Sequence, residues 1–430
     1  MSNSRRQIDV EGLRVGMYVA QLDRPWLETP FLFQGFYIRA EREIDDIRRY
    51  CQWVEIDIDE SDPSIRRALA AAPGKAATGS GQSIRKPSLW SRFLAWLGFA
   101  RQKDRSELMP GEFYKDTSNT ADELVVAKTI HSGALDSLVN VLSDIRKGGT
   151  VTMPKLEVIT GELVDSVLRN STAMSLLARM QQKDEYVSNH SLESSIWALV
   201  FGRHLGLDRD SLNAVGLGAL LLDVGKTKIP VKLLNKTDEL TDVERDYMRS
   251  HVEMGLEILK QTSGIDGRVL EMVATHHERY DGSGYPKGWK GNQIPVFGRI
   301  AGIVDSYSAM INDRPYAQAM SSFDAMREFK AMSDKHFQAE MVEQFIQAIG
   351  IFPVGTLVEL NTGEIAVVLK ENLESRLQPT LAIVRNSEKA EVAKIKTFDL
   401  YKQKGPTPTV WIERGIEAGT YNIDPREYFL

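Results

Sequence analysis

The amino-acid sequence predicts a mainly α protein with a small β-containing unit near each end. Three observations support this fold class. Apolar residues recur at helical spacing almost without interruption over residues 120–350. Val54, Ile56 and Ile58 alternate with acidic residues, which is the period of a half-buried strand. After Pro353, short apolar runs flank a glycine turn, which is typical of a β-hairpin.

Length and composition bound the classes to consider. The chain has 430 residues, which corresponds to two to four domains at roughly 100–200 residues each. Its hydrophobic fraction of 42% is ordinary for a globular protein and excludes wholesale disorder. Lysine and arginine number 53 against 59 aspartates and glutamates, and the net charge of −6 argues against a dedicated nucleic-acid binder.

Cysteine content and apolar runs exclude further classes. Cys51 is the only cysteine, so an intrachain disulfide and a cysteine-rich zinc site are both excluded, and any metal must be held by histidines and carboxylates. The longest apolar runs resemble Leu217–Leu222, well short of 18 residues, and no transmembrane helix is expected. Residues 1–10 are polar and lack the apolar core of a secretory signal, so the expected compartment is the cytoplasm.

Residues 8–60 are predicted to form a small N-terminal β-containing domain. The stretch 22–38 is rich in aromatic residues and is punctuated by prolines and a glycine, which indicates short strands and turns. Residues 61–118 are predicted to form a flexible linker. Within it, residues 68–83 are mostly Ala, Gly, Ser and Thr and have almost nothing to bury.

Residues 89–99 form an exception inside this linker. They are dense in tryptophan, phenylalanine and leucine and are flanked by basic residues, which predicts a short basic amphipathic helix. One interpretation is a segment that lies on a membrane surface or docks a partner. The other is a helix that packs on its own chain or on a second copy, and the small number of flanking charges favours this one.

Residues 119–350 are predicted to form a domain of six or more helices. Thr241 followed by Glu244 is a capping box that opens a helix through Leu259. Ser322 opens another helix through about Met332. Glycines and prolines lie between these helices rather than within them, so the block can enclose its own core.

Residues 353–402 are predicted to form a small β appendage. The runs 358–360 and 365–369 flank a turn that contains Gly363, which indicates a hairpin. Residues 381–384 and 392–395 are candidates for further strands. The tail 403–430 is expected to be irregular.

Histidines and acidic residues concentrate in the helical block. His276 and His277 are adjacent and are followed by Glu278 and by Asp-Gly-Ser-Gly-Tyr-Pro at 281–286. Adjacent helical residues point about 100° apart, so both imidazoles reach one centre only at a helix end or against a dinuclear cluster. Neutral imidazoles combined with carboxylates suit Mn, Fe or Zn.

Two aspartates follow apolar helical turns. Asp223 ends Gly-Ala-Leu-Leu-Leu-Asp and leads into Val-Gly-Lys226, and Asp305 ends Ile-Ala-Gly-Ile-Val-Asp. A buried carboxylate is costly unless it is paired or binds a metal. Each aspartate taken singly could be a helix N-cap or an ion-pair partner. Taken together with the histidines, they favour a metal centre.

These residues resemble an HD-GYP domain, the bacterial branch of the HD phosphohydrolases that hydrolyse cyclic di-GMP. The most specific match is His-His-Glu at 276–278 followed by the Asp-Gly-Ser-Gly-Tyr-Pro string at 281–286. The segment 17–26 also resembles the small domain often fused ahead of HD-GYP. The remaining matches are Glu185-Tyr186 with His190-Ser191, Asp223-Val-Gly-Lys226, His251, Asp305 and Asp313-Arg-Pro-Tyr316.

The resemblance implies an all-helical, metal-dependent phosphodiesterase domain that acts in bacterial second-messenger signalling. A divalent transition metal is implied, Fe or Mn, in one or two ions that activate a water molecule. Asp223 would bridge them. One ion would be held by Asp223, His251, His276 and His277, and the other by His190, Asp223 and Asp305.

The resemblance also assigns roles around the metals. Asp223 and Lys226 would be catalytic, and Lys226 and Arg314 would hold phosphate oxygens of cyclic di-GMP. Glu185 would serve a third ion or orient a ligand. A GGDEF-type protein partner is implied for the loop around the GYP residues, and a homo-oligomer is also considered. The loop residues with substrate-binding roles are Gly284, Tyr285 and Pro286.

Three departures from the family pattern bear on activity. The family's His-Asp pair is Leu222-Asp223 here, so one metal-ligand histidine is missing. Ser308 stands where a second acidic residue usually follows Asp305, and Ala317 stands where a basic residue usually follows Arg-Pro-Tyr. The first loss weakens one metal position, and the others weaken a third ion or the hold on phosphate.

The departures leave alternatives open. In the first, the protein is a phosphodiesterase with a reduced or altered metal set. In the second, it is a degenerate member that binds nucleotide or a partner with little catalysis. A third alternative, a pure scaffold, would not need three histidines beside Asp223. Metal content and turnover measured on one preparation discriminate among them.

Overall fold

The computed structural model describes residues 5–23, 36–38, 41–58, 61, 114–179, 186–313, 318–333, 335–372, 378–403, 410–417 and 419–428. The chain divides into two compact units, residues 1–86 with 358–413 and residues 87–357 with 414–430, and each is considered by itself. The amphipathic segment predicted at 89–99 lies outside the described residues, as do most of the linker 61–118 and the site residues Glu185 and Arg314.

The N-terminal residues form an antiparallel sheet with strand order β1-β4-β2-β3 and one helix. Val54 and Ile56 of β4 are buried against Ile44 and Ile47 of the helix, whereas Ile58 is only partly buried. The alternation in the sequence therefore predicts this strand and its buried face. The elements are β1 (Arg5–Asp9), η1 (Val10–Gly12), β2 (Tyr18–Leu22), β3 (Phe36–Tyr37), α1 (Glu41–Tyr50) and β4 (Trp53–Asp57).

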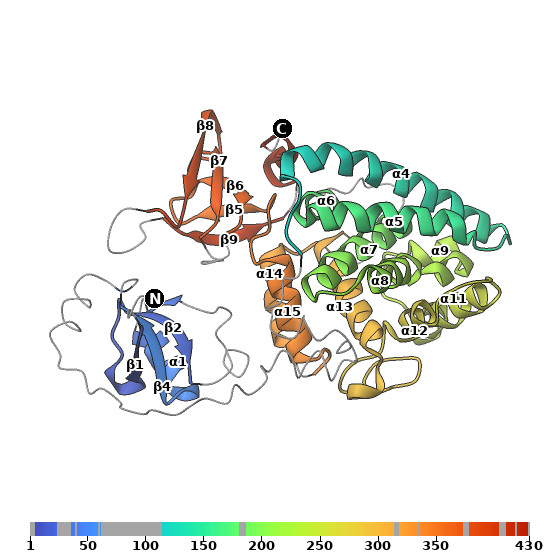
Figure 1. Cartoon of the computed structure of the whole chain (residues 1–430), viewed down its shortest axis with the longest axis horizontal. Helices are drawn as coiled ribbons and strands as arrows, with labels where there is room; N and C mark the ends of the chain where they lie inside the picture. The colour runs from blue at the N-terminus through green and yellow to red at the C-terminus, as the bar shows by residue number, and fades with distance from the viewer. Residues whose placement is uncertain are drawn as a thin grey trace. The chain divides into compact units, whose positions relative to one another are not determined.

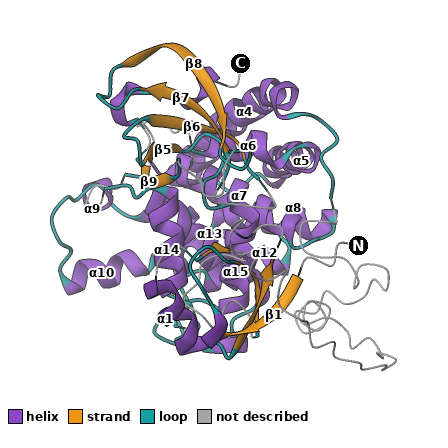
Figure 2. Cartoon of the chain, turned by 90° about the vertical axis from the view of Figure 1, so that its left-hand side faces the viewer, coloured by secondary structure: helices purple, strands orange, loops and turns teal. Residues whose placement is uncertain are grey.

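The C-terminal residues form a second sheet, with strand order β8-β7-β6-β5-β9. Figure 2 shows β5 to β8 side by side as one layer. The hairpin predicted around Gly363 joins β5 to β6, and Gly363 takes the positive φ of 81° that such a turn favours. The strands are β5 (Leu357–Leu360), β6 (Ile365–Lys370), β7 (Thr380–Arg385), β8 (Glu391–Asp399) and β9 (Ile412–Ile416).

Strand β9 corrects the expectation of an irregular tail over 403–430. Its sequence, Ile-Glu-Arg-Gly-Ile, carries two charges and a glycine, so no apolar alternation announces it. The strand forms because β5 offers it a free edge. Beside that edge the Asn361 N–H donates to the Trp411 carbonyl, and the Trp411 N–H donates to the Asn361 side-chain oxygen. Two short 3₁₀ turns follow it, η5 (Thr420–Asn422) and η6 (Pro425–Tyr428).

The second unit contains the long helical block, as the apolar periodicity predicts. Figure 1 shows its helices packed around α7. None of the described helices is long and apolar enough to cross a membrane. The elements are α4 (Thr120–Arg146), α5 (Met153–Arg169), α6 (Ser171–Ala178), α7 (Tyr186–His204), α8 (Arg209–Leu221), η3 (Val224–Lys228), α9 (Val231–Leu234), α10 (Asp242–Arg249), α11 (His251–Lys260), α12 (Gly267–Thr275), η4 (Gly291–Gln293), α13 (Val296–Ile311), α14 (Ser322–Ala331) and α15 (Ala339–Ile349).

Helix α7 is the centre of this unit. It is buried almost all round from Ser188 to Gly202, the pattern expected of a core helix. It packs against α4, α5, α6, α8, α13 and α15. Trp197 meets Tyr307 of α13 edge to face with ring centroids 5.4 Å apart, and Phe201 meets Phe345 of α15 in the same way at 5.2 Å. These contacts fix the positions of α7 and α13, which both contribute to the site.

The helix predicted over residues 241–259 is interrupted. The Thr241–Glu244 capping box is present and opens α10, but α10 ends at Arg249 and α11 begins at His251. The break comes at Ser250, whose hydroxyl bonds back to the Tyr247 carbonyl. A hydroxyl that competes for a backbone carbonyl in this way weakens helix continuity. The interruption places His251 at the start of a helix rather than within one.

We expect Phe201→Ala to destabilise the helical unit by about 3–5 kcal/mol, because it leaves a cavity where a fully buried ring packs on Phe345. Urea denaturation measures the change. Val125→Ala on the exposed face of α4 is the control and should shift stability by less than about 0.5 kcal/mol. Equal effects of the two substitutions would contradict the placement of α7 in the core.

Candidate metal centre

The centre is assembled from helix ends and from the interiors of two helices. The tandem histidines follow the last residue of α12, so they lie at a helix end, which is one of the two arrangements that their adjacency allows. Asp223 follows α8 directly and precedes η3. His251 is the first residue of α11, whereas His190 lies in α7 and Asp305 in α13.

The structure brings these residues into two groups that share Asp223. The ligand atoms of Asp223, His251, His276 and His277 lie within 4.8 Å of one another, and so do those of His190, Asp223 and Asp305. The two groups coincide with the two ligand sets that the resemblance implies.

Two imidazole lone pairs converge in the first group. The Nδ1 atoms of His251 and His276 lie 2.8 and 2.9 Å from the carbonyl oxygens of Met248 and Val273, so each Nδ1–H donates to the backbone. Each Nε2 atom is then an acceptor, and the two lie only 3.3 Å apart. The His251 Nε2 also lies 3.4 Å from Asp223 Oδ1.

The environment keeps these rings neutral. Burial lowers the pKa of His251 to about 4, and burial also lowers the pKa of His276 and His277. Neutral rings cannot place a proton between the facing Nε2 atoms at pH 7. A cation bound between them relieves the repulsion, so this donor set fits a transition metal.

Asp223 carries a full negative charge at the middle of the site. Burial raises its pKa, but the positive charge of Lys226 opposes burial, and that pKa lies well below its ordinary value. Lys226 Nζ donates to Asp223 Oδ2 at 2.6 Å. Asp223 Oδ1 is buried and accepts no hydrogen bond from any described residue, as expected of an oxygen kept for a metal.

Asp305 joins the second group to the first. His190 Nε2 lies 3.0 Å from Asp305 Oδ1 and 3.7 Å from Asp223 Oδ2. The other oxygen, Asp305 Oδ2, lies 3.9 Å from His277 Nδ1. Each of the two carboxylates, Asp223 and Asp305, therefore lies near histidines of both groups.

The short turn after Asp223 packs directly on α11. A Cβ atom at Gly225 would overlap the His251 carbonyl oxygen and would lie 2.6 Å from the Gly255 nitrogen. Only glycine allows this approach. The Asp-Val-Gly-Lys segment thus fixes Asp223 and His251 against each other.

The GYP loop is fastened beside the tandem histidines. Glu278 is buried and accepts hydrogen bonds from the backbone of Lys287 and Trp289, which ties down the loop. The Tyr285 ring stacks on His277 with centroids 4.6 Å apart. Gly284 presses on the backbone near His277, where no Cβ would fit, whereas Pro286 is exposed. Of the three predicted loop residues, Tyr285 is the one whose ring stacks on a histidine of the first group.

Some functional contacts were not predicted from the sequence. Glu193 and Ser308 form a buried hydrogen-bonded cluster behind His190. The available signal was a charged residue one turn after His190 on an otherwise buried helix. Leu222 is only 2% exposed and belongs to the hydrophobic core, so the position of the family histidine is filled by packing.

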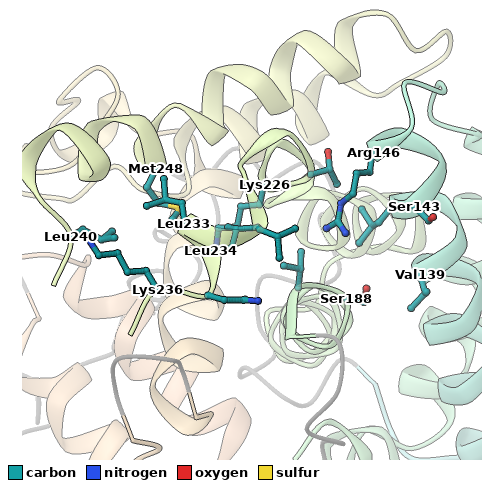
Figure 3. Close-up of a pocket in the computed structure, with 15 residues that line it drawn as sticks. Val139, Ser143, Arg146, Ser188, Lys226, Leu233, Leu234, Lys236, Leu240 and Met248 are labelled. Carbon is teal, nitrogen blue, oxygen red and sulfur yellow. The ribbon is translucent and has the colours of Figure 1, made fainter. Parts of the chain in front are cut away.

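A cavity of about 400 Å³ opens beside Lys226. Figure 3 shows the side chains around it, with Arg146 extending from α4. Arg146, Lys226 and Lys236 line it together with several aliphatic side chains, and none of the described lining residues is acidic. Its size suits a nucleotide-sized ligand, and its charge suits an anionic one with apolar parts.

Comparisons with known proteins agree with this architecture. Residues 171–341 match the family model described as HD domain, and residues 5–156 match a domain of unknown function, DUF3391. A cyclic di-GMP phosphodiesterase of Pseudomonas aeruginosa is 28% identical over 97% of this chain and 91% of its own length.

Two further relatives match shorter stretches of the chain. A cyclic di-GMP phosphodiesterase of Thermotoga maritima is 38% identical over 33% of this chain and 39% of its own length. A 3′3′-cGAMP-specific phosphodiesterase of Vibrio cholerae is 36% identical over 33% of this chain and 27% of its own length.

The helical unit gathers histidines and aspartates, and the part of it from residue 171 to residue 341 carries the match to the HD domain. The DUF3391 match covers the N-terminal sheet and extends into α4 and the start of α5. The resemblance in the sequence is therefore confirmed. The predicted domain boundaries and the roles of single residues stay predictions.

We expect Gly225→Ala to weaken metal binding at least 10-fold, because the added Cβ must push α11, and His251 with it, away from Asp223. Titration of the metal-stripped protein with Mn²⁺ measures the loss. Gly133→Ala in α4, where a Cβ meets nothing within 4 Å, is the control and should raise stability by about 0.4–1 kcal/mol without changing Mn²⁺ affinity. Wild-type affinity in Gly225→Ala would contradict the described packing.

Proposed function

We propose that this protein is a metal-dependent phosphodiesterase that hydrolyses cyclic di-GMP. The observation that carries the proposal is the convergence of the His251 and His276 lone pairs on the buried carboxylate of Asp223. The similarity to one cyclic di-GMP phosphodiesterase over 97% of this chain supports the substrate.

The site residues divide into two ligand sets around Asp223. His251, His276 and His277 would hold one ion with Asp223, and His190 and Asp305 would complete the other set. Divalent ions bound there would polarise the phosphodiester and lower the pKa of a bound water. Fe or Mn is the proposed metal, in one or two ions, and Glu185 is proposed to support a further ion or a ligand.

Lys226 lies between the metal ligands and the cavity. Its Nζ bonds Asp223 while the residue also lines the cavity, so its ammonium group is placed to hold a phosphate oxygen of a ligand in the cavity beside Asp223. The cations and aliphatic walls of the cavity would hold the anionic dinucleotide. Arg314 is proposed to hold a second phosphate oxygen, and Tyr285 to border the reacting phosphate.

A second function, nucleotide or partner binding with little hydrolysis, is favoured by one observation. Leu222 is buried in the core and supplies no ligand where the family has a histidine. The remaining ligands of both sets are nevertheless in place. We therefore place hydrolysis first and keep binding alone as the alternative. Docking of a GGDEF-type protein on the GYP loop, homo-oligomerisation and a cytoplasmic location stay predictions.

His276→Ala should remove most of the bound metal and lower cyclic di-GMP hydrolysis at least 100-fold, because it deletes one ligand and leaves the His251 lone pair without its counterpart. Metal analysis and chromatography of the nucleotide products, after anaerobic purification with Mn²⁺ or Fe²⁺, measure both effects. His131→Ala on α4 is the matched control. Wild-type protein that holds metal but hydrolyses neither cyclic di-GMP nor 3′3′-cGAMP would overturn the proposed function in favour of binding alone.

Leu222→His should raise the affinity for a second metal ion and the rate of hydrolysis, because it places an imidazole beside Asp223 where the family has one. The cost is about 1–3 kcal/mol of stability, because a polar ring replaces core packing. Leu221→His, the same change one residue earlier in the core, is the control and should destabilise without any gain. A folded Leu222→His protein with a second metal and no faster turnover would show that Ser308 and Ala317 limit the rate.

A further inference from the structure

A buried polar cluster lies behind His190, on the side away from the metal ligands. Glu193 follows His190 by three residues on α7, and Ser308 follows Asp305 by three residues on α13. Residues three apart share a helix face. The Glu193–Ser308 pair therefore repeats, one turn further along the same two helices, the pairing of His190 with Asp305. Both residues are buried, Glu193 at 2% exposure and Ser308 at 0%.

The hydrogen bonds in this cluster have a defined direction. Asn312 Nδ2 lies 2.6 Å from Glu193 Oε2 and 2.7 Å from the Ser308 carbonyl oxygen, so it is the amide nitrogen that donates to both. Ser308 Oγ donates to the same Glu193 oxygen at 2.9 Å. Glu193 Oε2 can accept both bonds whether or not the other oxygen of the carboxyl group carries a proton.

The direction determines the tautomer of His190. A serine hydroxyl has one proton, and Ser308 gives it to Glu193. Ser308 Oγ lies 3.1 Å from His190 Nδ1, so the ring nitrogen is the donor of that bond. With Nδ1 protonated, Nε2 is the nitrogen presented to Asp305 and Asp223.

We propose that Glu193, acting through the Ser308 hydroxyl, is a positioning residue that holds His190 in the tautomer and orientation required of a metal ligand. This inference rests on the proposed metal-dependent function of the same site. Histidines that ligate metals commonly donate their other ring N–H to an acceptor that fixes the ring, and loss of that partner costs 10–100-fold in metal affinity. Ser308 thus connects His190 to Glu193, in addition to standing where the family has an acidic residue.

The alternative is a purely structural role for the cluster. An isolated buried carboxyl group is costly in a helical core, and burial raises the pKa of Glu193 well above its ordinary value. A group that only joined α7 to α13 would need no contact beyond the bond that Asn312 donates to Glu193 Oε2. The contact between Ser308 and His190 is the feature that a structural role does not require.

The test is a Mn²⁺ titration of the metal-stripped full-length chain, followed by the EPR signal of free Mn²⁺. Ser308→Ala and Glu193→Met should weaken binding at the His190 set 10–100-fold and leave the His251 and His276 set unchanged. Glu193→Gln keeps an acceptor oxygen at similar volume and should retain affinity within about threefold of wild type. Ser194→Ala, which removes a buried α7 hydroxyl that bonds no described residue, is the control for serine loss.

Two results would overturn the inference. One is a Ser308→Ala protein with the metal affinities of Ser194→Ala, and the other is equal loss in Glu193→Gln and Glu193→Met. If Ser308→Ala does not fold, the comparison of Glu193→Gln with Glu193→Met tests the inference. Failure of the proposed function gives a different result. The wild-type protein would then hydrolyse no cyclic dinucleotide, but the Ser308 and Glu193 variants would still bind Mn²⁺ more weakly than wild type.

Discussion

The helical unit depends on one electrostatic constraint, the crowding of electron-pair donors around the buried Asp223 carboxylate. His251 and His276 direct unprotonated nitrogens at each other across 3.3 Å, and burial disfavours protonation of both. In a core of low dielectric such an arrangement is unfavourable unless a positive charge completes it. Lys226 supplies one such charge, and the geometry of the donors leaves a place for a metal.

The fold produces this arrangement because α8 and α12 end, and α11 begins, at the residues around Asp223. The ligands at the ends of α8, α11 and α12 can approach one another because no helix backbone continues through the space between them. The Nδ1 atoms of His251 and His276 bond carbonyls of the residues three positions earlier, so the backbone itself sets which nitrogen faces the centre. At His190, the Ser308 hydroxyl lies beside Nδ1 and connects it to Glu193.

Much of this could be predicted from the sequence because the signals were local. Helical periodicity, the Thr241–Glu244 capping box and the Gly363 hairpin each depend on neighbouring residues, and all are present. The two ligand sets could be predicted only from the family motifs. Their members lie up to about 115 residues apart along the chain, so no local pattern shows that they meet.

The features that were missed depend on tertiary context. Strand β9 exists because β5 offers it an edge, and its own sequence, with two charges and a glycine in five residues, has no apolar alternation. The break at Ser250 depends on one hydroxyl bond. The connection from His190 to Glu193 needs α13 beside α7, which no periodicity reveals.

The most direct measurement of the central claim is an anomalous-difference map from crystals of the full-length chain grown with Mn²⁺ and recorded near the manganese absorption edge. The account predicts a peak within bonding distance of His251 Nε2, His276 Nε2 and the Asp223 carboxylate. A map without a peak at these atoms, with the His251 and His276 nitrogens still facing each other across the present distance, would contradict it.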